Sequence, residues 1–161
     1  SIIESKQGKY LLKKFEPVSL MAGQEKERLK LGCGALIIND KNQVLLIKRG
    51  PRAKSERGVW SRPGGGIEQG ENPEEAVKRE IKEELGIEID ILEPLDFIDH
   101  LSDDGQRWLA LGYLARIRKG EPKIMEPGKI EEIRWFSLNE IPENLAIYTR
   151  QGIEKLKKKR N

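Results

Sequence analysis

One short segment of the sequence marks a helix at both ends, and it constrains the fold more than any other feature. Asn72 is suited to accept hydrogen bonds at the N-cap, Pro73 fits the first helical position, and Glu75 has the spacing of a capping box. Gly86 suits the left-handed conformation that often follows a helix. These signals predict a helix over residues 73–85, which needs a partner surface to pack against.

This helix has an apolar stripe with acidic residues beside it. The stripe consists of Val77, Ile81 and Leu85 and spans about 80° at 100° per residue. Glu80, Glu83 and Glu84 lie next to one another along one side, and like charges at this spacing cost roughly 0.2–0.5 kcal/mol per pair. A hard divalent cation would remove the repulsion. The helix alone leaves two interpretations open, a metal site and a solvated acidic face.

The segment before the helix is rich in residues that break regular structure. Between residues 51 and 70 the chain carries Pro51, Gly58, Pro63, Gly64, Gly65, Gly66 and Gly70. This composition predicts a shaped loop without helix or strand. Its glycines let the backbone approach a ligand, so Gly64 or Gly65 could direct a carbonyl toward an ion held by the helix.

The remaining pattern is that of a sheet. Two β-rich runs at residues 33–38 and 44–47 flank a turn signal and predict a hairpin. Further strands are expected at residues 87–91, 95–101, 108–117 and 132–136, and a short basic helix at residues 152–159. Strands on both sides of one central helix, with a second helix at the end, predict an α+β fold: a helix–sheet–helix sandwich around a mixed sheet.

Length and composition predict one domain without a membrane span. The chain has 161 residues, 30 Lys plus Arg, 27 Asp plus Glu, and no apolar run near the roughly 20 residues that a membrane helix needs. Residues 1–28 show no clean period and are interpreted as an N-terminal extension, followed by a single domain at residues 29–161. The start lacks the pattern of a secretory signal, which makes the cytoplasm the expected location.

Cysteine and histidine each occur once in the chain, and neither residue by itself predicts a metal or catalytic site. Cys33 is the only cysteine, so no internal disulfide and no thiolate zinc cage can form. It lies in an apolar stretch and is expected to be a packed core residue. The only histidine, His100, has no second His or Cys at ligand spacing and is expected to be a loop or strand-end residue.

The loop and the helix together form a longer motif. Gly65, five residues, Glu71, seven residues, Arg79-Glu80-Ile81, one residue, Glu83-Glu84, one residue and Gly86-Ile87 make a pattern of nine defined positions in 23 residues. This pattern resembles the Nudix box at every defined position. Flanking features, including Trp60 and the run from Ile133 to Leu138, extend the resemblance to residues 31–145. The Nudix fold, a helix–sheet–helix sandwich, is the expectation.

The resemblance implies a metal-dependent hydrolase. In this family the corresponding carboxylates bind Mg²⁺, and Mn²⁺ can substitute. Carried over residue by residue, the ligand set is Glu80, Glu83, Glu84 and the Gly64 carbonyl, and the three glutamates are also the expected catalytic residues. An acidic residue in the loop before the last strand serves family members as a base or further ligand. Glu131 and Glu132 both qualify here, and Glu131 is preferred.

Other motif positions have structural roles in the family. Glu71 and Arg79 match a pair that braces the loop against the helix by a charge-assisted contact. Gly65 and Gly86 match the glycines that begin and end the box. None of these four residues is expected to take part in the chemistry directly.

Four residues are candidates for substrate binding, each with an ordinary alternative. Arg49 and Arg52 precede the loop and would clamp phosphates, or would be surface arginines. Arg62 stands where the family often has Leu or Phe, and would contact a base or phosphate, or would be a loop charge. Trp108 would form a base-stacking platform, or would pack against the sheet.

The substrate is inferred mainly from missing subfamily signs. ADP-ribose hydrolases commonly have a Pro about sixteen residues past the box and the dinucleoside polyphosphate group a Tyr, whereas Asp103 and Asp104 stand there. A MutT-like enzyme that cuts a nucleoside triphosphate into monophosphate and pyrophosphate is therefore expected. ADP-ribose or another nucleotide sugar is the alternative substrate, and a non-catalytic nucleotide sensor the alternative class. An RNA substrate is not favoured, and a homodimer is possible.

Overall fold

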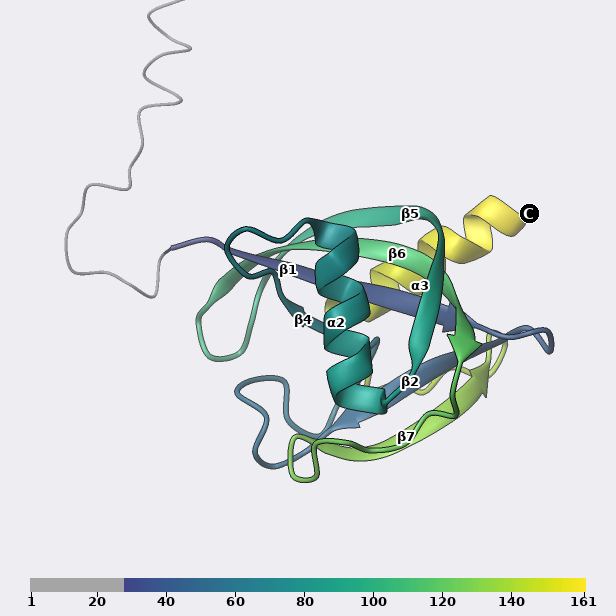
Figure 1. Cartoon of the computed structure of the whole chain (residues 1–161), viewed down its shortest axis with the longest axis horizontal. Coiled ribbons are helices and arrows are strands. Elements are labelled where there is room, and N and C mark those ends of the chain that lie inside the picture. Colours follow the sequence, from purple (N-terminus) through teal and green to yellow (C-terminus); the bar gives the residue numbers. More distant parts are fainter. Residues whose placement is uncertain (1–27) are drawn as a thin grey trace, which may run out of the picture.

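The computed structural model describes residues 28–161, so nearly all of the proposed N-terminal extension lies outside the described residues (Figure 1). The elements in chain order are β1 (Lys30–Ile38), β2 (Gln43–Arg49), β3 (Trp60–Ser61), β4 (Gly64–Gly66), α2 (Pro73–Leu85), β5 (Glu88–Leu101), β6 (Arg107–Lys119), β7 (Ile130–Ser137) and α3 (Ile147–Arg160). None of the helices in this range is long and apolar enough to cross a membrane.

The strands form one mixed sheet of seven strands. Its main order is β3-β2-β1-β6-β5, with β4 paired to β1 and β7 paired to β2. β1 and β6 run parallel, whereas the other pairings between the named strands are antiparallel. Helix α2 lies on one side of the sheet and α3 on the other (Figure 1). The predicted α+β sandwich around a mixed sheet is confirmed.

Alternate residues of the central strand supply two separate cores. Ala35 and Ile37 of β1 pack in the cluster that contains Val77, Ile81 and Leu85 of α2, which confirms the apolar stripe. Leu36 of β1 packs in the second cluster, with residues of α3. This alternation follows from the period of two in a strand, and it places one helix over each face.

Helix α2 begins and ends where the sequence predicts. The Asn72 side chain accepts a hydrogen bond from the Glu75 N–H, and the Glu75 side chain accepts one from the Asn72 N–H. Gly86 has φ 68° and donates its N–H to the Lys82 carbonyl. Both ends of the helix are thus fixed by hydrogen bonds between neighbouring residues, and these bonds also set the positions of the carboxylates on its surface.

Three details differ from the sequence prediction. Part of the predicted loop is strand β4, where Gly64, Gly65 and Gly66 pair with β1. The two strands predicted at residues 87–91 and 95–101 are one strand, β5, with register shifts between Ile91 and Asp96. Helix α3 begins at Ile147, five residues earlier than predicted. In each case a long-range contact overrides a local signal.

Candidate active site

The glycine-rich strand β4 lies directly on the acidic side of α2. A Cβ atom at Gly65 would collide with the Glu80 carboxyl group, so only glycine permits this approach. The Gly64 N–H donates a long hydrogen bond of 3.4 Å to Glu84 Oε2. The loop and the helix carboxylates therefore form one site, at the edge where the chain passes from β4 toward α2.

Two of the helix carboxylates, Glu80 and Glu84, are partly buried. Burial raises the pKa of Glu84 well above its usual value, and the neighbouring charges of Glu80 and Glu126 raise it further. Burial also raises the pKa of Glu80, against the effect of a hydrogen bond from Arg79. Carboxylates in such surroundings either hold a proton or need a cation.

Glu83 has a different environment from its two neighbours. Its side chain is 54% exposed, and Arg79 Nη1 lies 3.2 Å from Glu83 Oε2. Within residues 28–161, no three His, Cys, Asp or Glu side chains are already grouped as a metal site. The three expected ligands lie on one helix, with Glu83 turned toward Arg79.

Arg79 connects the loop to the helix. Its guanidinium makes two bonds to the Glu71 carboxylate, of 2.6 Å and 3.0 Å, and Nη2 donates to the Gly66 carbonyl at 3.0 Å. The Glu71 hydrogen bond raises the Arg79 pKa and lowers that of Glu71. This geometry has the form of the brace that the motif implies, since it ties the start of the box to α2.

An acidic residue that the sequence reasoning missed lies beside this cluster. Glu126 is close enough for its charge to raise the pKa of both Glu80 and Glu84. Its segment is held against the end of α2, because the Met125 N–H donates to the Glu84 carbonyl at 3.0 Å. Glu126 pairs with Lys129 at 3.1 Å. The turn signal Pro127-Gly128 places Glu126 just before β7, but its contact with the end of α2 is a long-range feature that the sequence does not show.

Glu131 and Glu132, which the sequence suggested as a base or further metal ligand, lie in strand β7. Glu131 is exposed and lines a shallow hollow with Arg49, Arg57 and neighbouring loop residues. Glu132 accepts a hydrogen bond from Arg134 at 2.9 Å. Neither is among the main causes of the raised pKa of Glu80 or Glu84, whereas Glu126 is among those of both.

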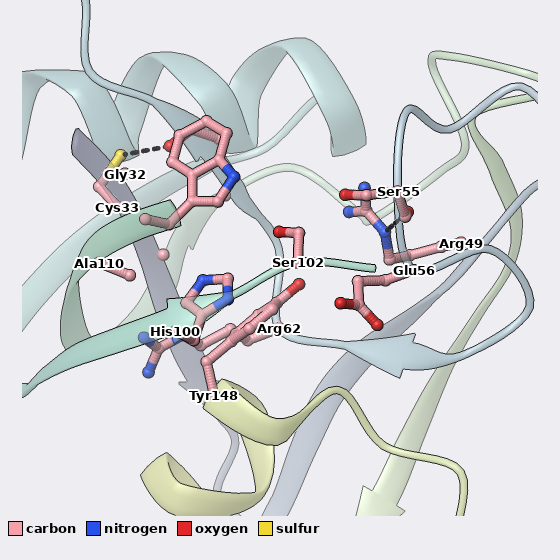
Figure 2. A pocket seen from close by; sticks show the side chains of 14 residues that line it. Gly32, Cys33, Arg49, Ser55, Glu56, Arg62, His100, Ser102, Ala110 and Tyr148 are labelled. Atoms are coloured by element: carbon pink, nitrogen blue, oxygen red, sulfur yellow. Dashed lines mark hydrogen bonds between the residues drawn. The ribbon is translucent and has the colours of Figure 1, made fainter. Parts of the chain in front are cut away.

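A pocket opens on the α3 side of the sheet and reaches the same loop. Its lining includes Gly64 and Gly65 at one end and His100, Trp108 and Tyr148 around the rest. Figure 2 shows His100 close to Tyr148, with Arg49, Ser55 and Glu56 on the opposite side of the pocket. The pocket thus connects an aromatic region to the glycines that cover the acidic cluster.

The candidate substrate-binding arginines have three different surroundings. Arg49 lines the pocket and donates from Nε to the Ser55 carbonyl at 2.8 Å. Arg52 is exposed, and its backbone N–H donates to the Gly128 carbonyl. Arg62 is 3% exposed and lies beneath the pocket, so it is not an exposed loop charge.

Arg62 forms a buried ion pair that the sequence did not reveal. Its two terminal nitrogens donate to the two Asp96 oxygens at 2.8 Å and 3.1 Å, with side-chain exposures of 2% and 5%. The Arg62 N–H donates to Thr149 Oγ1 of α3 at 2.9 Å. The pair joins the loop before β4 to β5 and α3, and it forms the base of the pocket.

The two residues that occur once have clear places. Cys33 is 6% exposed in the core, and burial raises its pKa to about 11, so the thiol stays protonated at neutral pH. His100 lies near the end of β5, as expected, but it also lines the pocket. Tyr148 and Ser102, which line it too, were not foreseen, because their proximity depends on the sheet register and on the start of α3.

Comparisons with known proteins identify relatives of this chain. Residues 28–156 match the model of the NUDIX domain. A "NAD-capped RNA hydrolase NudC" of Stutzerimonas stutzeri (strain A1501) is 32% identical over 124 residues, which are 77% of this chain and 42% of the relative. An "8-oxo-dGTP diphosphatase" of Proteus vulgaris is 36% identical over 74 residues, 46% of this chain and 66% of the relative.

A solved structure is similar over most of the described residues. The MutT NUDIX hydrolase from Burkholderia pseudomallei matches with a TM-score of 0.75 and 42% sequence identity, covering 81% of this chain and 99% of that one. The chain spans only 42% of the length of the NudC relative.

Proposed function

The chain belongs to the NUDIX family of hydrolases, and from this premise we propose that it hydrolyses a nucleoside triphosphate to a nucleoside monophosphate and pyrophosphate with the help of Mg²⁺. The observation that carries the proposal is the acidic cluster of Glu80, Glu84 and Glu126 beside the glycines of β4, in which Arg79 pairs with Glu80 and Lys129 with Glu126, while no cationic side chain within residues 28–161 pairs with Glu84. A desolvated carboxylate without a cationic partner is a group that a hard cation would stabilise.

The residues present fit such an ion. Oxygen ligands suit Mg²⁺, and Glu80, Glu83, Glu84 and the Gly64 carbonyl are the proposed set, with Glu126 added from the structure. Glu83 would have to turn away from Arg79 to join them. Bound there, Mg²⁺ would neutralise phosphate oxygens and lower the pKa of a bound water, and Mn²⁺ would serve equally.

The chain itself would position the phosphates and move one proton. Arg49 lines the pocket and would hold a phosphate oxygen by a charge-assisted hydrogen bond. A carboxylate of the cluster would accept the proton of the attacking water. Glu126 replaces Glu131 as our candidate for that base, because its charge acts on Glu80 and Glu84.

The point of attack distinguishes chemically different reactions. We propose attack at the β-phosphorus, which places the oxygen of water in pyrophosphate. Hydrolysis in ¹⁸O water followed by mass spectrometry measures this directly. Label in the monophosphate instead would show attack at the α-phosphorus and would contradict the proposed chemistry.

A substrate panel tests the other part of the proposal. The purified chain is assayed with Mg²⁺ on nucleoside triphosphates, 8-oxo-dGTP, ADP-ribose, a nucleotide sugar and an NAD-capped RNA, with identification of products. The last compound is included because a relative at 32% identity is named as its hydrolase. ADP-ribose cut with a tenfold higher kcat/KM than any triphosphate, about 1.4 kcal/mol, would overturn the substrate assignment. No hydrolysis of any compound would favour the nucleotide sensor.

A further inference from the structure

The floor of the pocket lacks side chains at the positions that face α3. Gly32 and Gly34 alternate along β1, and they stand beside Ala110 and Gly112 of the parallel strand β6. A Cβ at Gly32 would meet the Trp108 ring at 3.2 Å, and one at Gly34 would meet Arg62 Nε at 3.1 Å. The residues between them face the other core. The small residues therefore let the Trp108 ring and the Arg62 side chain lie close against the sheet, and these two side chains line the pocket above it.

Aromatic side chains stand around this floor. His100 of β5 and Trp108 of β6 are direct partners in the antiparallel register, so their side chains lie on the same face of the sheet as neighbours. Tyr148 of α3 stacks against His100, with ring centroids 4.7 Å apart and planes inclined by 35°. Three elements thus bring aromatic rings to one open surface.

The floor is continuous with the proposed reaction site. The same pocket is lined by Gly64 and Gly65, which cover the acidic cluster, and by Arg49. A ligand whose phosphates reach these glycines has its remaining part in the hollow lined by His100, Trp108 and Tyr148. A planar aromatic group suits that hollow, because rings stack favourably on aromatic side chains.

We propose that this aromatic hollow binds the nucleobase of the substrate, stacked against Trp108, and that the His100 ring nitrogens recognise the edge of the base by hydrogen bonds. The inference rests on the proposed function, since it assumes a substrate with phosphates at Gly64 and a base beyond them. It assigns a specificity role to His100.

The surroundings of His100 suit this role. Burial and the positive charge of Arg62 lower its pKa, while Asp99 acts in the opposite direction. A neutral imidazole offers one donor and one acceptor, and the edges of nucleobases present both kinds of group. Arg62 itself is held by both oxygens of Asp96 and stays in place beneath the ring of Tyr148, 5.8 Å from its centroid.

The chain offers an unusually direct test, because His100 is its only histidine. The imidazole signals of the full chain are followed by NMR in the absence of metal while a nucleoside 5′-monophosphate is added at up to millimolar concentrations. Ribose 5-phosphate is the matched control, since it has the sugar and phosphate without the base. Monophosphates should shift the His100 signals in a base-dependent manner, and ribose 5-phosphate should not. His100 signals that do not shift with either ligand, or that shift equally with both, would overturn the inference.

A kinetic experiment tests the recognition of the base separately. His100→Phe keeps an aromatic ring but removes both nitrogens, and it should lower kcat/KM for the preferred triphosphate by about tenfold and reduce the differences among bases. The matched control is Asp90→Asn, an exposed residue of β5 that pairs with Arg118 at 3.7 Å and does not line the pocket, and it should leave the kinetics unchanged. Unchanged base selectivity in His100→Phe contradicts the inference.

The two proposals fail in distinguishable ways. Base-dependent shifts of His100 without hydrolysis of any nucleotide would reject the proposed function and keep the base site. Rapid hydrolysis of triphosphates, together with His100 signals that nucleotides do not shift, would support the proposed function and reject the base site. The NMR measurement needs no metal and no turnover, so it does not depend on the acidic cluster.

Discussion

Two groups of charged residues lie on opposite sides of the same sheet, and they differ in how their charges are balanced. Arg62 and Asp96 form a closed pair in which both partners are buried and both carboxylate oxygens accept a hydrogen bond. The cluster of Glu80, Glu84 and Glu126 has an excess of negative charge, and the Glu84 carboxylate has only a long bond from the Gly64 N–H.

We interpret the difference as that between a structural charge group and the proposed catalytic one. A buried pair that satisfies itself needs no ligand, and its loss is felt mainly as lost stability. An unbalanced cluster destabilises the empty fold and therefore gains from a cation. The position of each group relative to the pocket agrees with this distinction, since the pair lies beneath the floor and the cluster lies where phosphates would arrive.

The largest effect is expected from opening the closed pair. Asp96→Asn leaves the Arg62 charge buried without its carboxylate and should destabilise the fold by about 3–5 kcal/mol, measured by urea unfolding. The control is the double variant Arg62→Met with Asp96→Leu, which removes both charges and should lose much less. A loss below about 1 kcal/mol for Asp96→Asn would show that the pair is not a closed structural unit.

The next effect concerns the acidic cluster and should appear in turnover. Glu84→Gln should lower kcat by at least about two orders of magnitude, roughly 2.7 kcal/mol, because transition-state charge is no longer stabilised. The metal-free variant should be at least as stable as the parent, since a buried charge has been removed. The exposed Glu74→Gln in the first turn of α2 is the control. An active Glu84→Gln variant would show that the chemistry lies elsewhere.

A smaller effect is expected on adding the cation to the folded protein. Mg²⁺ at ten times its dissociation constant should stabilise the parent by about 1.4 kcal/mol, seen as a rise in Tm. The rise should disappear in the variant that combines Glu83→Gln with Glu84→Gln, and it should persist in Arg62→Met with Asp96→Leu. Melting curves of the parent that coincide with and without Mg²⁺ would contradict the proposed site.

The smallest expected effect is the slope of stability against pH. The folded pKa of Glu84 is raised above the ordinary value of 4.5, so the folded state binds a proton more tightly than the unfolded state. In chelator, stability should therefore fall as pH rises from 4.5 toward the raised pKa. Glu84→Gln should remove that part of the slope. Equal slopes for parent and variant in urea unfolding would show that Glu84 is not desolvated.

The sequence predicted those features that depend on neighbouring residues. The limits of α2 follow from Asn72, Glu75 and Gly86, whose side chains or conformations act within one turn. The hairpin of β1 and β2 follows from a turn between two apolar runs. The brace between Glu71 and Arg79 joins residues eight positions apart and is implied by the motif. Each of these features joins residues that are close together in the sequence.

Features that depend on distant segments were not predictable in this way. The parallel pairing of β1 with β6 brings Gly32 beside Ala110, although 78 positions separate them. The early start of α3 depends on two long-range contacts. The buried Thr149 hydroxyl accepts a hydrogen bond from the Arg62 N–H, and the Tyr148 ring packs against the His100 ring. Glu126 reaches the acidic cluster only because its segment pairs with the end of α2. No local pattern encodes these contacts.

Gly112 and Gly152, which lie beside the buried pair of Arg62 and Asp96, limit how this part of the sequence can evolve. A Cβ at Gly112 would overlap the Asp96 carboxylate, and one at Gly152 would lie 2.8 Å from Asp96 Oδ2 and 2.9 Å from Arg62 Nη1. Side chains at both places would need smaller residues at positions 62 and 96 together, because both members of the ion pair occupy that space. The four residues should therefore change together among close relatives, as one inherited unit, and single exchanges at any of them should be rare.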